Sequence, residues 1–174
     1  MAYRKRPHRK RWNWYLPGFL VVAALAGFFN LSDRDVISGD REYVQRVVDG
    51  DTLMLGTGER VRLIGVNTPE TVHPKKAVEA FGKEASAFTR RIAEGKLFRL
   101  EFDPFSSRVS DGKDRYSRTL AYVFLQDGTH LNAEIIRQGY GFAVSSSPPL
   151  KYQEEFRRLE REAREMGRGL WKER

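Results

Sequence analysis

Three short segments of the chain carry acidic and arginine residues at spacings suited to phosphate chemistry. They are residues 49–52 (Asp-Gly-Asp-Thr), 62–70 (Arg-Leu-Ile-Gly-Val-Asn-Thr-Pro-Glu) and 114–122 (Asp-Arg-Tyr-Ser-Arg-Thr-Leu-Ala-Tyr). A phosphodiester is an anion, so attack by water requires positive charge on its non-bridging oxygens and donors that match the charge developing at phosphorus. The three segments therefore predict a metal-dependent phosphodiesterase.

The oxygen-bearing residues and the arginines of these segments are expected to have different roles. Asp51, Asn67 and Glu70 supply oxygen atoms that can bind a cation or orient water. Arg62 and Arg118 supply planar donors, each able to hold two phosphate oxygens at once. Because each arginine leads or lies within an apolar, strand-like run, we expect the two to face one shared anion.

Each of these assignments has a structural alternative. Arg62 could form an ion pair that serves stability alone, and Glu70 could cap a helix. The pair 49–50 (Asp-Gly) could be only a hairpin turn, because it supplies the positive dihedral angles that a two-residue loop needs. Lys75 and Lys76 could contact phosphates beyond the scissile one or form only a solvated surface.

The elements that must position these residues follow from apolar periodicity and turn signals. Strands are expected at residues 43–48, 52–55, 60–66, 97–102 and 119–125, and helices at 77–93, 131–138 and 152–166. Five strands with two interleaved helices and a last amphipathic helix predict an α+β fold. The expected architecture is a five-stranded closed barrel of the oligonucleotide/oligosaccharide-binding (OB) type with three helices.

The N-terminal part of the chain predicts a membrane anchor. Residues 12–31 carry no charge and begin with aromatic residues, and a transmembrane helix needs about 20 apolar residues. The basic segment 1–11 would stay in the cytoplasm, so the linker 32–40 and the domain 41–174 would lie on the extracytoplasmic side. A cleaved signal peptide ending near residues 24–26 (Ala-Leu-Ala), which would give a secreted protein, and a buried core helix are the alternatives.

Charge and cysteine content say less about function. The 174-residue chain has a formal net charge of +8, but six cations precede the first acidic residue, and the remaining 25 basic and 23 acidic residues nearly balance. The high pI is therefore weak support for nucleic-acid binding. The absence of cysteine excludes disulfides, thiolate metal sites and thiol redox chemistry.

From about Tyr43 to Trp171 the chain resembles the thermonuclease (staphylococcal nuclease-like) family. The resemblance rests, in order, on Asp49-Gly50-Asp51-Thr52, Arg62-Leu63, Thr68-Pro69-Glu70, His73-Pro74-Lys75-Lys76, Gly82-Lys83-Glu84-Ala85, Asp114-Arg115-Tyr116, Arg118, Leu120-Ala121-Tyr122 and Gly169-Leu170-Trp171. It implies a five-stranded OB-type barrel with three helices. It also implies calcium-dependent cleavage of DNA and RNA that leaves 3'-phosphate ends.

The resemblance also implies roles for single residues. Asp51 matches the first calcium ligand, Arg62 and Arg118 match the two catalytic arginines, and Glu70 matches the acid that positions or deprotonates the attacking water. Substrate contacts are expected from Lys75, Lys76, Arg115 and Tyr116.

Three positions depart from the family pattern. Asn67 stands where an aspartate is usual; an amide oxygen still binds Ca²⁺, but the lost charge predicts weaker binding. Weaker binding would be tolerable outside the cell, where calcium-binding modules work with dissociation constants of ~0.1–1 mM. Ser117 replaces a glycine, which matters if the backbone there needs a positive φ. Residues 145–149 (Ser-Ser-Ser-Pro-Pro) stand where the namesake has two tyrosines that pack the nucleotide, so base stacking from that side is lost.

These observations predict a monomeric, envelope-anchored, calcium-dependent nuclease without a protein partner. The alternative is a catalytically weak or inactive relative that binds nucleic acid or protein through the same barrel, with Asn67 as the mark of decay. Against it, decay has no reason to spare Arg62, Glu70 and Arg118 together. A carbohydrate-binding barrel has no support beyond the fold.

Overall fold

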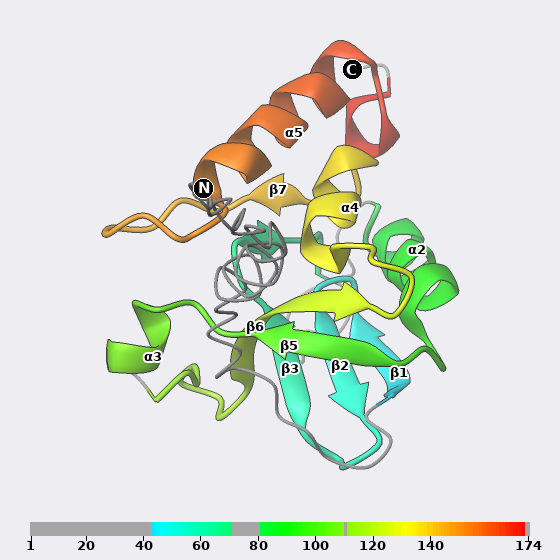
Figure 1. Ribbon diagram of the computed structural model, residues 1–174. Coiled ribbons are helices and arrows are strands. Elements are labelled where there is room, and N and C mark those ends of the chain that lie inside the picture. Colours follow the sequence, from blue (N-terminus) through cyan, green and yellow to red (C-terminus); the bar gives the residue numbers. More distant parts are fainter. Residues whose placement is uncertain (1–42, 71–80, 110, 173–174) are drawn as a thin grey trace, which may run out of the picture. The chain divides into compact units, whose positions relative to one another are not determined.

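The fold is built on a mixed five-stranded sheet (Figure 1). The computed structural model describes residues 43–70, 81–109 and 111–172. The strands of the sheet, in spatial order, are β1 (Val44–Asp49), β2 (Thr52–Leu55), β3 (Arg60–Leu63), β6 (Thr119–Leu125) and β5 (Phe98–Glu101). The neighbours β3 and β6 are parallel, and the other neighbouring pairs are antiparallel. All five strands lie within two residues of their predicted starts.

The predicted α+β class is confirmed, but the predicted closed barrel is wrong. The sheet stays open between β1 and β5. Within the described residues, the starts of these strands meet through an isolated bridge between Tyr43 and Leu97 and a hydrogen bond of 3.0 Å from Val44 N to Lys96 O. Closure requires a continuous ladder around the barrel, and β1 and β5 approach each other only at their first residues.

The strand predicted at 60–66 is shorter than expected because Gly65 turns the chain. Gly65 has a φ of +77°, and a Cβ there would lie 2.7 Å from Cε2 of Phe156, so both backbone angle and space demand glycine. The chain then forms β4 (Val66–Asn67), which pairs with β7 (Phe142–Ala143) in a separate two-stranded sheet. This second sheet was not predicted from the sequence.

The three predicted helices are present as α2 (Gly82–Ala93), α4 (Leu131–Arg137) and α5 (Gln153–Glu165). The short helices α3 (Ser106–Val109) and η1 (Gly169–Trp171) were not predicted. The helix predicted at 77–93 begins in the structure at Gly82, because Phe81 before it takes a left-handed φ of 71°. Residues 77–80 of that predicted helix lie outside the described residues.

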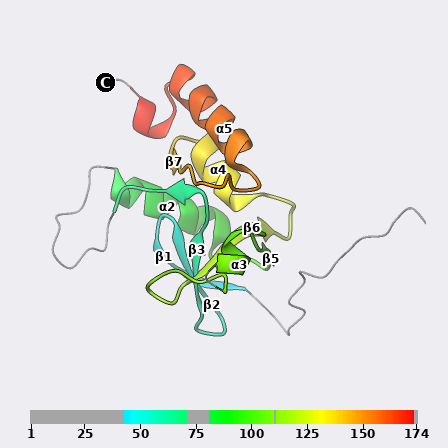
Figure 2. The same ribbon diagram turned by 90° about the vertical axis from the view of Figure 1, so that its left-hand side faces the viewer.

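Helices cover the sheet from two directions. Figures 1 and 2 show α2 beside β1, with α4 and α5 together beyond the end of the sheet where β7 lies. The fully buried Asn132 of α4 ties the layers together: its Oδ1 accepts from Val123 N at 2.9 Å, and its Nδ2 donates to Ile64 O at 2.9 Å. This amide therefore fixes the end of β3 against β6.

Several predictions concern residues that the structure does not describe. The expected anchor 12–31, the segments 1–11 and 32–40, and the loop containing His73, Lys75 and Lys76 are not among the described residues. Across the ranges that are described, we find no helix with both the length and the apolar character needed to cross a bilayer.

His130, at the start of α4, lies in an aromatic cluster. Its ring stacks on Phe124 with centroids 4.4 Å apart and meets the ring of Tyr152 at 4.8 Å. Its Nε2 is buried without a hydrogen-bond partner among the described residues. Burial lowers the pKa of His130 to about 4.

We expect this histidine to destabilise the protein in mild acid. The unfolded chain protonates the imidazole below about pH 6.5, whereas the native protein does so only near pH 4. Between about pH 7 and about pH 5, the free energy of unfolding of the wild type should therefore fall by about 1–2 kcal/mol more than that of His130→Phe. Phenylalanine is the control because it keeps the ring stack but does not titrate. Denaturant unfolding of both proteins measures this, and equal losses would contradict it.

Candidate active site

Asp51 lies in the two-residue loop between β1 and β2, where Asp49 pairs with Thr52. Its carboxylate is buried, with the residue 6% exposed. One oxygen, Oδ1, accepts from the Thr52 hydroxyl at 3.1 Å, and the other, Oδ2, accepts from Thr68 N at 3.0 Å. The acid thus connects the first hairpin to the segment that follows β4.

Gly50 is required in this loop for a different reason from the one expected. The predicted hairpin turn is present, but Gly50 does not take the positive φ expected of it. A Cβ on Gly50 would lie 2.6 Å from Oγ1 of Thr68, so close approach of the two segments demands glycine. Helix α2 holds the loop in place, because the Thr89 hydroxyl donates to Gly50 O at 2.7 Å and the Ser86 hydroxyl to Asp49 Oδ1 at 3.2 Å.

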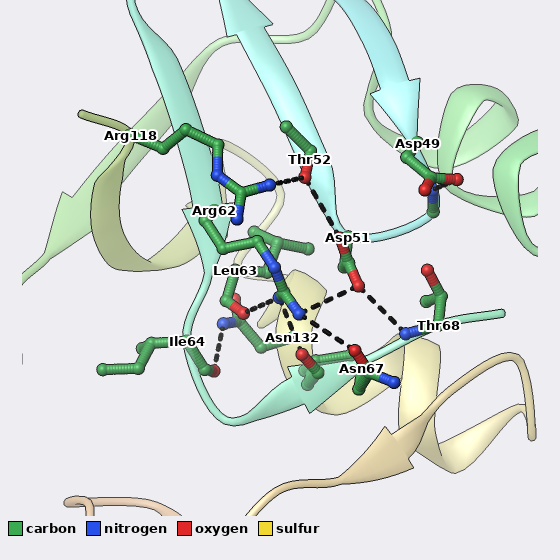
Figure 3. Close-up of polar contacts among 12 residues, drawn as sticks. Asp49, Asp51, Thr52, Arg62, Leu63, Ile64, Asn67, Thr68, Arg118 and Asn132 are labelled. Carbon is green, nitrogen blue, oxygen red and sulfur yellow. Dashed lines mark hydrogen bonds and ion pairs between the residues drawn. The ribbon is translucent and has the colours of Figure 1, made fainter. Parts of the chain in front are cut away.

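Arg62 on β3 is half-buried and held by four oxygens (Figure 3). Its Nη1 donates to the carbonyls of Leu63 at 2.6 Å and Val66 at 2.7 Å. Its Nη2 lies 3.1 Å from Asp51 Oδ2 and 3.3 Å from Asn67 Oδ1. Burial lowers the pKa of Arg62 and Asp51 opposes the shift, but an arginine stays charged at neutral pH.

Arg118, which directly precedes β6, has its own acid. Its Nε and Nη2 both lie 2.7 Å from Oδ2 of Asp114, and its Nη1 donates to the Thr52 hydroxyl at 3.3 Å. The other oxygen of Asp114 accepts from the backbone N–H groups of Tyr116 and Arg118. Burial acts to raise the pKa of Asp114, but these hydrogen bonds outweigh it and leave the pKa below its usual value.

The two guanidinium groups line one cleft of about 410 Å³, together with Asp114. The parallel register of β3 and β6 explains this, since Arg62 is aligned with Leu120, and Arg118 lies two residues before Leu120. Side chains two residues apart on a strand share a face. The charge of Arg118 also acts to lower the pKa of Arg62, as expected for two close cations.

The oxygens of Asp51 and Asn67 suit a hard cation. Asp51 Oδ2 and Asn67 Oδ1 converge on the same nitrogen of Arg62, so the two oxygens lie near one point in space. Carboxylate and amide oxygens are both ligands that Ca²⁺ accepts. The described residues contain no group of three or more His, Cys, Asp or Glu able to hold a metal ion.

The remaining predicted residues lie further out. Glu70 is half-buried, three residues beyond Asn67. Tyr116 is 63% exposed, and its ring faces the guanidinium of Arg115 at 4.8 Å and that of Arg118 at 5.2 Å. The roles given to these residues in catalysis or substrate binding stay predictions.

The residues that hold the site together, Asp114, Thr52 and Thr68, were not predicted from the sequence to have this role. No role was given to Asp114, although an acid four residues before Arg118 was a usable signal. Thr52 and Thr68 carried no such signal, because their contacts with Asp51 exist only after the hairpin and β4 meet. The hydroxyl of Thr68 is buried and has no hydrogen-bond partner in the described part of the chain.

Comparison of the sequence with known proteins places the chain in a family. A family model described as Staphylococcal nuclease homologue matches residues 60–173. The thermonuclease of Staphylococcus intermedius is 40% identical over 148 residues, which cover 83% of each chain. The chain belongs to the staphylococcal nuclease family. It is a phosphodiesterase of the nuclease type, and the family is generally metal-dependent.

Two further relatives of this nuclease point the same way. The thermonuclease of Staphylococcus hyicus is 40% identical over 132 residues, covering 74% of this chain and 73% of the relative. Endonuclease YncB of Bacillus subtilis is 33% identical over 132 residues, covering 74% of this chain and 60% of the relative.

Ser117 has a left-handed backbone, with a φ of 59°. This is the conformation that makes glycine the favoured residue there, and an L side chain in it costs about 1–2 kcal/mol. We expect Ser117→Gly to raise the free energy of unfolding by about 0.5–1 kcal/mol, after the greater entropy of an unfolded glycine is subtracted. Thermal and denaturant unfolding measure this change.

The matched control for Ser117→Gly is Ala87→Gly at an exposed position of α2. Glycine in a helix interior should instead lower stability by about 0.5–1 kcal/mol. A loss of stability in both variants would contradict the account of Ser117.

Proposed function

We propose that the protein is a calcium-dependent nuclease that hydrolyses DNA and RNA and leaves 3'-phosphate ends. One observation carries the proposal. Two arginines, each held by its own carboxylate, line one cleft beside the converging oxygens of Asp51 and Asn67. Cations and hard oxygen ligands around one cleft suit phosphodiester hydrolysis.

Arg62 and Arg118 bind the scissile phosphate and stabilise the charge that develops on its oxygens. Hydrogen bonds to the Leu63 and Val66 carbonyls and to Asp114 restrict both side chains before substrate arrives. Donors fixed in advance need little reorganisation in the transition state, which is the main source of such stabilisation.

Asp51 and Asn67 would hold the calcium ion. When bound, the ion supplies positive charge to a phosphate oxygen and to the attacking water. Glu70 orients or deprotonates that water. Attack at phosphorus expels the 5'-oxygen, which takes up a proton, and the phosphate stays on the 3'-oxygen.

The catalytic domain would act outside the cytoplasm as a membrane-anchored monomer. The uncharged run 12–31 behind a basic N-terminus supports this location, and signal cleavage would give a secreted form. A calcium site that lacks one carboxylate also suits extracellular calcium. Retention of the full chain in membranes after alkaline extraction would support the anchor, and release would favour the secreted form.

The alternative function is that of a catalytically weak module which binds nucleic acid or protein. The amide of Asn67 favours it, because the site has one negative charge fewer than the family pattern. The ion pairs that hold both arginines on the cleft argue against it, since simple binding does not require two restrained guanidinium groups at one phosphate.

We expect plasmid digestion in calcium by the full chain, and a large loss in two variants. Arg62→Ala should lower kcat/KM by about 10²–10³-fold, because it removes donors to the developing charge. Glu70→Gln should also lower it strongly, through kcat. Arg90→Ala, which changes an exposed arginine on α2, is the control and should leave activity unchanged. Failure of the wild type to cleave at any calcium concentration would favour the binding module.

We expect Asn67→Asp to strengthen calcium binding. A second carboxylate beside Asp51 adds a unit of negative charge at the site and should lower the calcium midpoint of activity roughly tenfold. Isothermal titration calorimetry with calcium alone measures the same change without substrate. Gln126→Glu on the exposed turn after β6 adds an equal charge away from the cleft and is the control. An unchanged midpoint would refute the role given to Asn67.

A further inference from the structure

The cleft that the two arginines line also has apolar side chains in its lining. Beyond Arg62, Arg118 and Asp114, its lining includes Phe105, Leu120, Val144 and Leu150. Its volume of about 410 Å³ falls within the ~300–1,000 Å³ range of small-molecule sites. A nucleotide combines the same two characters, because it carries an anionic phosphate and a flat apolar base.

We propose that Phe105 contacts the nucleobase next to the scissile phosphate, and that it is a specificity-determining residue of this nuclease. The proposal rests on the function proposed above. Among the described residues that line the cleft, Phe105 is the aromatic one, and it is half-buried. Aromatic side chains that stack on bases are a general means of holding single-stranded nucleic acid.

The ring is placed by a turn that the sequence did not reveal. Phe105 directly precedes α3, and Figures 1 and 2 show α3 and the loop after β7 on the same side of the sheet. That loop carries Val144 and Leu150 into the cleft but has no aromatic residue at 145–149. The α3 turn therefore supplies the aromatic surface that this loop lacks.

One buried carboxylate joins two of the segments that line the cleft. Asp103 is 1% exposed, and its Oδ1 accepts from Phe105 N at 3.0 Å and Ser106 N at 3.3 Å. Its Oδ2 accepts from the Tyr122 hydroxyl and from Lys151 N, both at 2.9 Å. Asp103 thus ties the Phe105 turn to Lys151, the residue after Leu150, so these two segments of the lining are held together without substrate.

Tyr116 is the other aromatic side chain near the arginines, but it fits the base less well. It is 63% exposed, and the guanidinium groups of Arg115 and Arg118 lie against its ring. Tyr116 is not among the residues that line the cleft.

The test compares a short single-stranded oligodeoxynucleotide with the same oligonucleotide carrying tetrahydrofuran abasic residues on both sides of the scissile bond. With bases present, Phe105→Ala should raise KM about 5- to 100-fold with kcat little changed, as loss of one stacking contact requires. With abasic residues, wild type and variant should have the same KM, because the phosphodiester is identical and no base is there to stack.

Two further variants separate stacking from folding. Phe105→Tyr keeps the ring and should retain the wild-type KM, whereas Phe105→Leu keeps an apolar side chain without the ring and should behave as Phe105→Ala does. Thermal unfolding of each variant checks that the α3 turn is intact. An equal rise in KM on both oligonucleotides, or a wild-type KM in Phe105→Ala, would overturn the inference.

Failure of the proposed function has a different result. If the wild type cleaves neither oligonucleotide, the nuclease proposal fails. Fluorescence anisotropy titration of the same two oligonucleotides with wild type and Phe105→Ala then decides the inference alone. Weaker binding by the variant only when bases are present supports it, and equal binding overturns it.

Discussion

The buried ion pair between Asp51 and Arg62 is the interaction on which the rest of the site depends. Asp51 takes a hydrogen bond from Thr68 N, and Arg62 donates to the Val66 carbonyl, so the pair connects the first hairpin, β3 and β4. Removal of either partner would leave the other charge buried without compensation, which is far more costly than the net value of such a pair. The geometry of the cleft therefore depends on both residues.

Balance of charge explains how two arginines can share one cleft. Arg62 faces Asp51, and Arg118 faces Asp114, so each cation is partly neutralised before any phosphate arrives. Neither acid removes the arginine from the cleft, because both guanidinium groups still line it. The two guanidinium groups are held in place and keep part of their positive charge, which suits the binding of a phosphodiester anion.

Departures from the family pattern lie around this centre. Ser117 accepts a left-handed backbone that positions Arg118, and Asn67 presents an amide oxygen beside Asp51. The loop that lacks aromatic residues faces a turn that carries Phe105.

Local sequence determined the elements and the chemistry: alternating apolar residues gave the five strands and the spacing of apolar residues gave the three helices, because those patterns act within a few residues. The open sheet, the β4–β7 pairing and α3 could not be predicted in this way. They depend on contacts between segments that are distant in the chain, such as Gly65 with Phe156 and Asp103 with Lys151. The residue types that could bind phosphate were evident from the chain itself. Only the parallel alignment of β3 with β6 decided that Arg62 and Arg118 share a face, because register between distant strands is set by packing of the whole core.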